Sequence, residues 1–170
     1  PCAINQKGEL KFTLRDAESV ETYHEDMALY SVREKGKLRY GYVDKRGETI
    51  IDPVYSGAMS FSQGKAAVRD AKGKWGFIGR NGEAVIECRY DEVMPFNDRD
   101  AALVKENGLW GVIDKKGRYI IDPQFEVMRN DGKWLQIKSK ENLWGWCDLD
   151  GEIVIAPRFE KAFGFFDGDR

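Results

Sequence analysis

The residues that could take part in catalysis are scarce, and His24 is the only histidine of the chain. A Ser-His-Asp or Cys-His arrangement would have to use it, because the imidazole activates the nucleophile in both. His24 lies in an acidic, irregular stretch, residues 21–26, and an isolated histidine is more often solvated than catalytic. We therefore interpret it as a loop or strand-edge residue and expect the chain not to be an enzyme.

The metal-ligating residues do not form a recognisable ligand set. A structural zinc site needs four closely spaced ligands and a disulfide framework needs paired cysteines, whereas the chain has Cys2, Cys88 and Cys147. Residues 148–151 (Asp-Leu-Asp-Gly) and 167–169 (Asp-Gly-Asp) resemble the opening of a calcium loop, but the acidic residue that completes an EF-hand does not follow. We interpret the first as a hairpin turn and expect no metal and no cofactor.

Charge and hydropathy narrow the classes of partner. The chain carries 27 Lys and Arg against 29 Asp and Glu, and no segment concentrates enough positive charge to bind a run of phosphates, so we expect no nucleic acid. No apolar run is long enough to cross a bilayer, so we expect no membrane insertion. Cys88 and Cys147 are interpreted as small buried hydrophobic residues, which favours a reducing, cytoplasmic compartment. The periplasm or cell surface stays open if a signal peptide has been removed.

One pattern organises the chain: an aromatic residue followed by glycine recurs at intervals of 35, 35 and 34 residues. The four pairs are Tyr40-Gly41, Trp75-Gly76, Trp110-Gly111 and Trp144-Gly145. Self-similarity at such a period is typical of a tandem repeat. We predict one array over residues 1–170, with units at 1–39 (degenerate), 40–74, 75–109, 110–143 and 144–170 (incomplete). Because the chain starts on a repeat boundary without an initiator Met, we expect it to be a portion of a longer protein.

Each unit predicts short antiparallel strands. A β-rich run from the aromatic residue ends at an Asp-x-x-Gly turn such as 114–117, where Asp bonds the backbone and Gly takes positive φ. A second run rich in β-branched residues follows and ends at a proline, as in 119–123. A third strand closes the unit, and a fourth fits segments of the type 90–96. Only residues 15–30 mix charged and apolar positions ambiguously, without a clean helical stripe.

The predicted fold class is therefore all-β: three-stranded units or hairpins of about 35 residues, stacked as an elongated, twisted solenoid. A closed β-propeller is the alternative, although its blades usually hold four strands. Glycosidase-type carboxylate pairs are set by three-dimensional spacing and stay open in principle. Most acidic residues recur as turn or edge residues of the repeat, however, which favours a structural role.

These residues resemble the WG (KWG) repeat family of bacterial proteins over the whole chain, strongly from Tyr40 to Phe159. The shared pattern is Trp-Gly-x-Ile-Asp-x-x-Gly followed by Ile-x-Pro-x-Phe/Tyr, and Lys74 precedes Trp75 as in the longer family name. Departures are Tyr40 for Trp, Gly79 for Asp and Arg89 for Pro. The resemblance implies a β-repeat array for interaction or ligand binding, and it supplies no catalytic residue.

Function is best sought where a unit departs from the common pattern. Four aromatic residues have no counterpart of their size in most units: Trp134, Trp146, Phe165 and Phe166. If exposed, they would anchor a protein partner or offer stacking surfaces for sugar rings. If buried, they pack between strands. We predict a non-catalytic module that binds a protein or acts as a scaffold, with a carbohydrate or cell-envelope ligand as the alternative.

Overall fold

The structure is a computed structural model that describes residues 2–4, 10–13, 16–131, 134–148 and 150–161. These residues form eighteen strands and no helix, so the all-β prediction is confirmed. It follows that the described ranges contain no helix that could cross a membrane.

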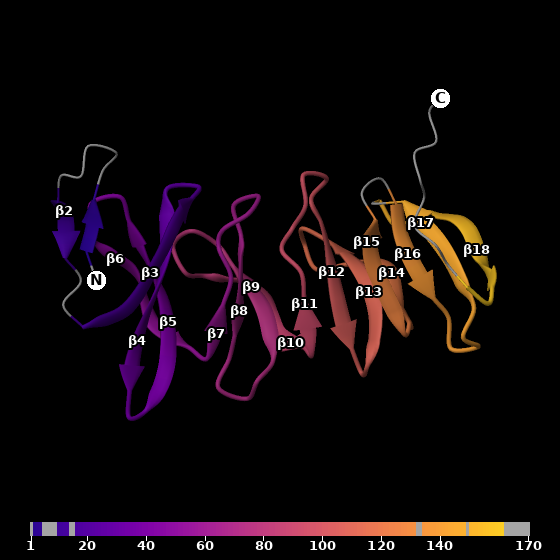
Figure 1. Cartoon of the computed structure of the whole chain (residues 1–170), viewed down its shortest axis with the longest axis horizontal. Helices are drawn as coiled ribbons and strands as arrows, with labels where there is room; N and C mark the ends of the chain where they lie inside the picture. The colour runs from indigo at the N-terminus through magenta and orange to yellow at the C-terminus, as the bar shows by residue number, and fades with distance from the viewer. Residues whose placement is uncertain (1, 5–9, 14–15, 132–133, 149, 162–170) are drawn as a thin grey trace. The chain divides into compact units, whose positions relative to one another are not determined.

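The strands form four antiparallel sheets of four strands each, and none closes into a barrel (Figure 1). The first sheet has the order β3 (Ala17–His24), β4 (Met27–Glu34), β5 (Lys37–Asp44), β6 (Thr49–Tyr55). The second contains β7 (Gly57–Ala58), β8 (Ala66–Arg69), β9 (Trp75–Ile78) and β10 (Ala84–Tyr90). The third contains β11 (Glu92–Val93), β12 (Ala101–Glu106), β13 (Leu109–Asp114) and β14 (Tyr119–Phe125). The fourth contains β15 (Val127–Asp131), β16 (Trp134–Lys138), β17 (Trp144–Asp148) and β18 (Ile153–Phe159).

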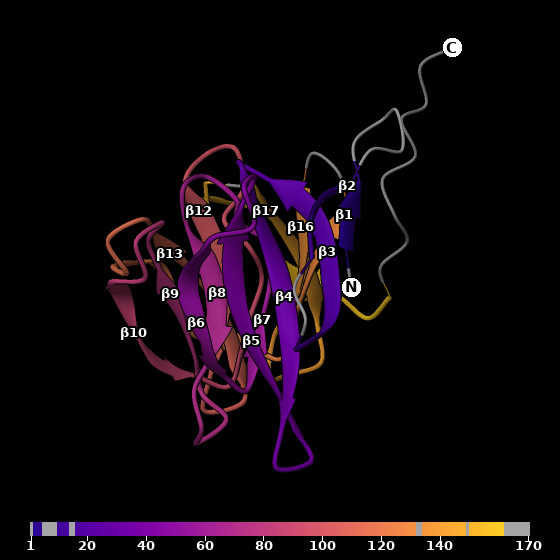
Figure 2. The same cartoon turned by 90° about the vertical axis from the view of Figure 1, so that its left-hand side faces the viewer.

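Two shorter strands, β1 (Cys2–Ile4) and β2 (Leu10–Thr13), pair separately. Each full sheet is a meander in which neighbours in sequence are neighbours in space, as the long β4–β5 hairpin shows (Figure 2). The ambiguous segment 15–30 belongs to β3 and β4. The described residues divide into two compact units, 1–95 and 96–170. The single array over 1–170, and its belonging to a longer protein, stay predictions.

Each full sheet has four strands rather than the three that the repeat predicts most clearly. The additional strands β7, β11 and β15 follow the aromatic residues Tyr55, Tyr90 and Phe125, in the segment where a fourth strand was expected to fit. Each later sheet therefore starts before its aromatic–glycine pair. The sheets and the sequence units are offset in phase by two strands, because the first two strands of each later sheet precede that pair.

The glycine of each aromatic–glycine pair lies beside an irregularity in the next strand. In the third sheet Trp110 pairs with Phe125 and Val112 with Ile121, so three residues of β14 lie opposite Gly111 alone. A Cβ atom at Gly111 would lie 2.5 Å from the Ile121 carbonyl oxygen and 2.8 Å from Pro123 N. Only glycine lets the β14 backbone approach so closely.

The Asp-x-x-Gly turns are built by the aspartate side chain. Asp114 Oδ1 accepts the backbone N–H groups of Lys116 (2.9 Å) and Arg118 (3.0 Å), and Gly117 has a φ of +78°. At the turn that departs from the pattern, Gly79 keeps the backbone bond from Gly82 N to its own carbonyl (3.0 Å) without a side chain. The predicted turn chemistry is confirmed.

The core of each unit lies between successive sheets. In unit 1–95, the first two sheets bury a cluster that includes Leu29, Tyr42 and Val68. In unit 96–170, the third and fourth sheets bury Val112, Leu135 and other residues between them. Antiparallel sheets with apolar faces bury them in this way, one against the next.

Glycines of the Asp-x-x-Gly turns also lie at the edge of the contact between successive sheets. A Cβ at Gly82 would lie 3.4 Å from Ile51 Cγ1, and one at Gly151 would lie 2.7 Å from Ile120 Cγ2. Each turn therefore packs on the last strand of the preceding sheet within its unit. The second glycine of the repeat has two constraints, positive φ and lack of space.

Candidate functional site

His24 lies at the end of β3, an edge strand of its sheet, and is exposed. Its Nε2 atom is 3.4 Å from Thr22 Oγ1, and its backbone pairs with Met27 across the hairpin. The interpretation as an exposed strand-edge residue is confirmed. No serine or cysteine hydrogen bond to His24 occurs among the described residues.

The candidate calcium loop at 148–151 is a hairpin turn. Asp148 Oδ1 accepts the backbone N–H groups of Asp150 (3.0 Å) and Glu152 (2.7 Å). The Asp150 carboxylate instead accepts from the Arg99 guanidinium at 2.8 Å. Both carboxylates thus have structural roles, and in the part of the chain that the structure describes no three His, Cys, Asp or Glu residues gather as metal ligands. The second stretch, 167–169, lies outside the described residues.

The two cysteines of the repeat region have different surroundings. Cys147 is fully buried on β17, and this burial raises the pKa of its thiol to about 12. Cys88 is half-buried on β10, with Sγ 3.8 Å from the Val68 carbonyl oxygen, and burial also raises its pKa. Raised pKa values keep both thiols protonated and weakly nucleophilic at neutral pH. The prediction of a buried hydrophobic role is confirmed for Cys147 and holds in part for Cys88.

The four aromatic candidates do not share one environment. Trp146 is 8% exposed on β17 and makes an edge contact with Phe159, with ring centroids 5.8 Å apart. Trp134 is half-buried on β16. Phe165 and Phe166 lie outside the described residues. Both described tryptophans belong to the fourth sheet.

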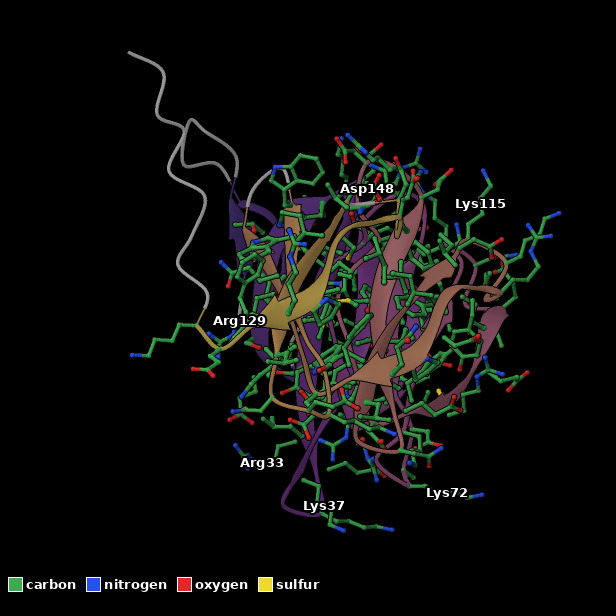
Figure 3. The ribbon with its side chains drawn as sticks, turned by 90° about the vertical axis from the view of Figure 1, so that its right-hand side faces the viewer. Arg33, Lys37, Lys72, Lys115, Arg129 and Asp148 are labelled. Atoms are coloured by element: carbon green, nitrogen blue, oxygen red, sulfur yellow. The ribbon has the colours of Figure 1, made fainter. Side chains whose placement is uncertain are left out.

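Strand register places Trp134 and Trp146 on the same face of that sheet, because residues directly opposite each other share a face. Gln136 pairs with Trp146, and Lys138 pairs with Trp144. We call this the outer face, shown toward the viewer in Figure 3 with Arg129 and Asp148 labelled. By register it comprises Val127, Arg129, Asp131, Trp134, Gln136, Lys138, Trp144, Trp146, Asp148, Ile155 and Phe159. The opposite face carries Met128, Leu135, Ile137 and Cys147, which pack into the core against the third sheet.

The equivalent face of the third sheet is buried against the fourth sheet, so the two faces can be compared position by position. In the third sheet the corresponding register pairs are Ala101 with Asp114, Leu103 with Val112 and Lys105 with Trp110. In the fourth sheet they are Trp134 with Asp148, Gln136 with Trp146 and Lys138 with Trp144. Small or aliphatic residues that pack against the next sheet are thus replaced by two tryptophans and a glutamine.

The aromatic residues that recur in every repeat are also more exposed in the fourth sheet than in the third. Trp110 is 9% exposed because the fourth sheet covers it, and Phe125 is 3% exposed. The equivalent of Trp110, Trp144, is half-buried, and the equivalent of Phe125, Phe159, is 39% exposed. The outer face therefore presents aromatic surface that is core surface one repeat earlier.

Three cations surround these rings. The Lys138 Nζ atom lies 5.5 Å and the Arg129 Cζ atom 6.0 Å from the Trp144 ring centroid. Arg158 Cζ lies 5.2 Å from the centroid of Phe159. Such cation–π contacts hold the cationic groups beside the aromatic surface.

The sequence did not single out Trp144, Phe159 or the three cations. Trp144 and Phe159 match the common pattern, so nothing in their types distinguishes them from buried Trp110 and Phe125. A usable signal lay at neighbouring strand positions: Trp134, Gln136 and Trp146 stand where the preceding repeat has Ala101, Leu103 and Val112.

A separate hollow of about 400 Å³ lies between the third and fourth sheets at their β14 and β18 edges. Its walls are Gln124, Phe125, Ser139, Lys140, Glu141, Ile153 and Pro157. Lys140 and Glu141 are exposed turn residues, and the walls hold no cluster of buried titratable groups.

Comparison with known folds is consistent with a tandem β-repeat. The computationally designed Ika8 protein superposes with a TM-score of 0.52 at 10% identity, over 87% of this chain and 52% of that protein. This chain thus spans about half the length of Ika8, and the similarity is one of fold. BamB from Moraxella catarrhalis (TM-score 0.45, 9% identity, 86% of this chain and 51% of BamB) and HIRA residues 644–1017 (0.45, 7%, 85% and 54%) are more distant. No curated protein matches the sequence.

Family comparison gives a closer result. The WG containing repeat family matches residues 40–75, 75–110, 110–134 and 144–168, which is most of the chain. The matched segments start at the aromatic–glycine pairs whose glycines lie beside the irregular strands. The chain belongs to the WG repeat family.

Proposed function

We propose that this chain is a non-catalytic repeat module that binds a protein partner through the outer face of its fourth sheet. The observation that carries the proposal is the contrast between Trp110, buried at 9%, and its equivalent Trp144, half-exposed beside the exposed Phe159. Exposed aromatic surface of this kind, with arginine at its rim, is typical of protein-binding hot spots.

The polar surroundings of the rings favour a protein over a sugar. A sugar ring would stack on an open face of Trp144, whereas Lys138 and Arg129 already lie over that ring. Cations beside aromatic rings suit a partner that brings both carboxylates and apolar side chains. Carbohydrate binding is therefore the second candidate, supported by the exposed Phe159 ring alone.

The test compares proteins captured by the immobilised chain with those captured by a face variant. Trp134→Ala combined with Phe159→Ala removes aromatic surface, and Ala101 shows that the third sheet accommodates alanine at the position of Trp134. The matched control is Ile50→Ala with Val54→Ala, two exposed aliphatic residues of β6. Far-ultraviolet circular dichroism and thermal unfolding establish that all three proteins are folded.

We expect a saturable protein in the lysate of the native host to bind the wild type and the control but not the face variant. Equal capture by all three proteins would contradict the role of the outer face. Capture of no protein, together with retention on a glycan array that the face variant loses, would replace the proposal with the carbohydrate alternative.

A further inference from the structure

We propose that the outer face binds an acidic peptide segment, one in which carboxylates alternate with apolar side chains. This inference rests on the proposed function and specifies the chemistry of the partner. Three observations support it: the cations beside the rings form no ion pair with a described residue, the aspartates of the face lie by register away from them, and apolar ring surface is exposed between them.

The three cations beside the rings of the outer face are Arg129 and Lys138 on the face itself and Arg158 next to Phe159, and they differ from the basic residues that form ion pairs. Elsewhere, arginine and lysine side chains form ion pairs with carboxylates, for example Arg33 with Glu18 (2.6 Å) and Lys115 with Asp100 (2.8 Å). Arg129, Lys138 and Arg158 lie over aromatic rings, and within the described ranges none of the three forms an ion pair. Their charge is available to a carboxylate that arrives from outside.

By register, the aspartates of the face, Asp131 and Asp148, both lie opposite Trp134, and Asp148 is already engaged. Asp148 lies at the end of β17, and its Oδ1 atom accepts two backbone N–H groups of the turn that follows. Its register partner is Trp134, whereas the cations lie around Trp144 and Phe159. The aromatic centre of the face is therefore positive, although the chain as a whole carries a formal charge of −2.

The aromatic surface adds an apolar requirement. Phe159 is 39% exposed and the Trp144 ring is half-buried, so an entirely hydrophilic polyanion would leave this surface uncovered. A segment in which Asp or Glu alternates with apolar residues places carboxylates on the cations and apolar groups on the rings. The spacing of alternate side chains in an extended peptide suits a sheet surface.

The experiment selects a displayed library of random peptides on the immobilised chain, with subsequent binding measured by fluorescence anisotropy of the enriched peptides. Two variants are compared with the wild type. One replaces the face cations (Arg129→Gln, Lys138→Gln and Arg158→Gln). The matched control replaces three exposed lysines, one at the start of β5 and two in turns (Lys37→Gln, Lys72→Gln and Lys116→Gln), and changes the net charge equally; the first two are labelled in Figure 3.

We expect the enriched peptides to be rich in Asp and Glu interspersed with apolar residues. Their affinity should fall about tenfold or more in the face variant, stay close to the wild-type value in the control, and weaken with added salt. Neutral or basic enriched peptides whose binding is lost in Trp134→Ala/Phe159→Ala would overturn the acidic segment but leave the protein-binding function intact.

Other outcomes reject the proposal in distinguishable ways. Peptides that bind all variants equally, or a library that yields no enriched peptide, would count against both the acidic segment and the outer face as a protein site. The same proteins are also tested on vesicles of phosphatidylserine and on single-stranded DNA. Binding to either of these, but not to peptides, and its loss in the cation variant would show that the positive face serves another polyanion.

Discussion

The backbone of Ile121 occupies the space where any side chain at Gly111 would have to start. The Ile121 carbonyl oxygen would be 2.5 Å from a Cβ atom there, and the atoms next to it belong to the β14 backbone. The same relationship joins Gly76 to Ile86, Gly41 to Ile51 and Gly145 to Ile155. The glycine that defines the family is thus required by the approach of two strands.

Gly111→Ala should therefore lower the free energy of unfolding by about 3 kcal/mol, because backbone atoms cannot move aside as side chains do. The control is Gly79→Ala, whose Cβ would meet the carboxylate of Glu83, the flexible end of an exposed side chain. Gly79 also lies outside the left-handed region. We expect a change below about 0.5 kcal/mol there. Urea unfolding measures both, and equal losses would contradict the role of the strand approach.

The turn glycines make a second comparison possible. Gly108 and Gly151 both have positive φ, +81° and +92°, but only at Gly151 would a Cβ meet neighbours, with Ile120 Cγ2 at 2.7 Å. Alanine at Gly108 should cost about 1 kcal/mol from backbone strain. Alanine at Gly151 should cost about 1–3 kcal/mol more, since the turn packs on the preceding sheet. Chemical denaturation of both variants tests this, and similar losses would show that the turn has room to shift.

Asp114 should stabilise its turn mainly through Oδ1. Asp114→Ala should cost about 1 kcal/mol, whereas Asp114→Asn should cost less because an amide oxygen accepts the same bonds. Asn97 provides the precedent: its Oδ1 accepts the N–H groups of Arg99 and Ala101 at 3.0 Å. Thermal unfolding of the two variants gives the comparison, and a larger loss for asparagine would assign the effect to charge.

The same residue predicts a dependence on acid pH. Although partial burial acts to raise it, hydrogen bonds from the Arg118 backbone and guanidinium hold the pKa of Asp114 below its usual 3.8. A lowered folded-state pKa gives stability that is present above 3.8 and is lost as the pH falls through the folded value. Asp114→Asn should lose less stability than the wild type on acidification over that window. Unfolding measured at a series of acid pH values tests this, and an equal loss of stability in both proteins would refute it.

Cys147 predicts the opposite dependence at alkaline pH. Burial raises its pKa from 9.0 to about 12, so its stabilising contribution is present below 9.0 and is lost as the pH rises toward about 12. Cys147→Val replaces the thiol with the residue found at the equivalent Val43 and removes this titration. The melting temperature of the wild type should fall more steeply than that of the variant over this window. Matching slopes would mean that Cys147 ionises without unfolding.

The two described tryptophan candidates should differ in their effect on stability. Trp146→Ala removes a ring that is 8% exposed and packed on Phe159, and it should cost about 3 kcal/mol or more. Trp134→Ala removes a half-buried ring and should cost about 1 kcal/mol. Guanidinium unfolding measures both values. If Trp134 proved the more costly, it would be a core residue and a poor contact for a partner.

Local chemistry was sufficient to predict the repeated part of the fold. The Asp-x-x-Gly turns, the β-branched runs and the prolines each specify a conformation within a few residues, so the strands of the later sheets could be predicted. The β3–β4 hairpin could not, because its turn residues Glu25 and Asp26 adopt positive φ of 50° and 69° without glycine or asparagine. Strands β7 and β11 have two residues each, too few for a period to be visible.

The candidate site depended on contacts between distant parts of the chain. Trp110 and Trp144 are the same residue in the same local pattern, and only the sheet that covers Trp110 distinguishes them. Burial of this kind is a property of the folded neighbours. The sequence indicated Trp134 and Trp146 by their size, but the cations acquire a role only when register places them beside the rings.

The offset between sheets and sequence units has a consequence for how such genes change length. Each later sheet takes two strands from the end of one unit and two from the start of the next. Unequal recombination between any two equivalent codons would therefore gain or lose one complete sheet together with its turn and its packing surface, wherever the breakpoint falls. Repeat number can drift in evolution without the need to invent a new junction.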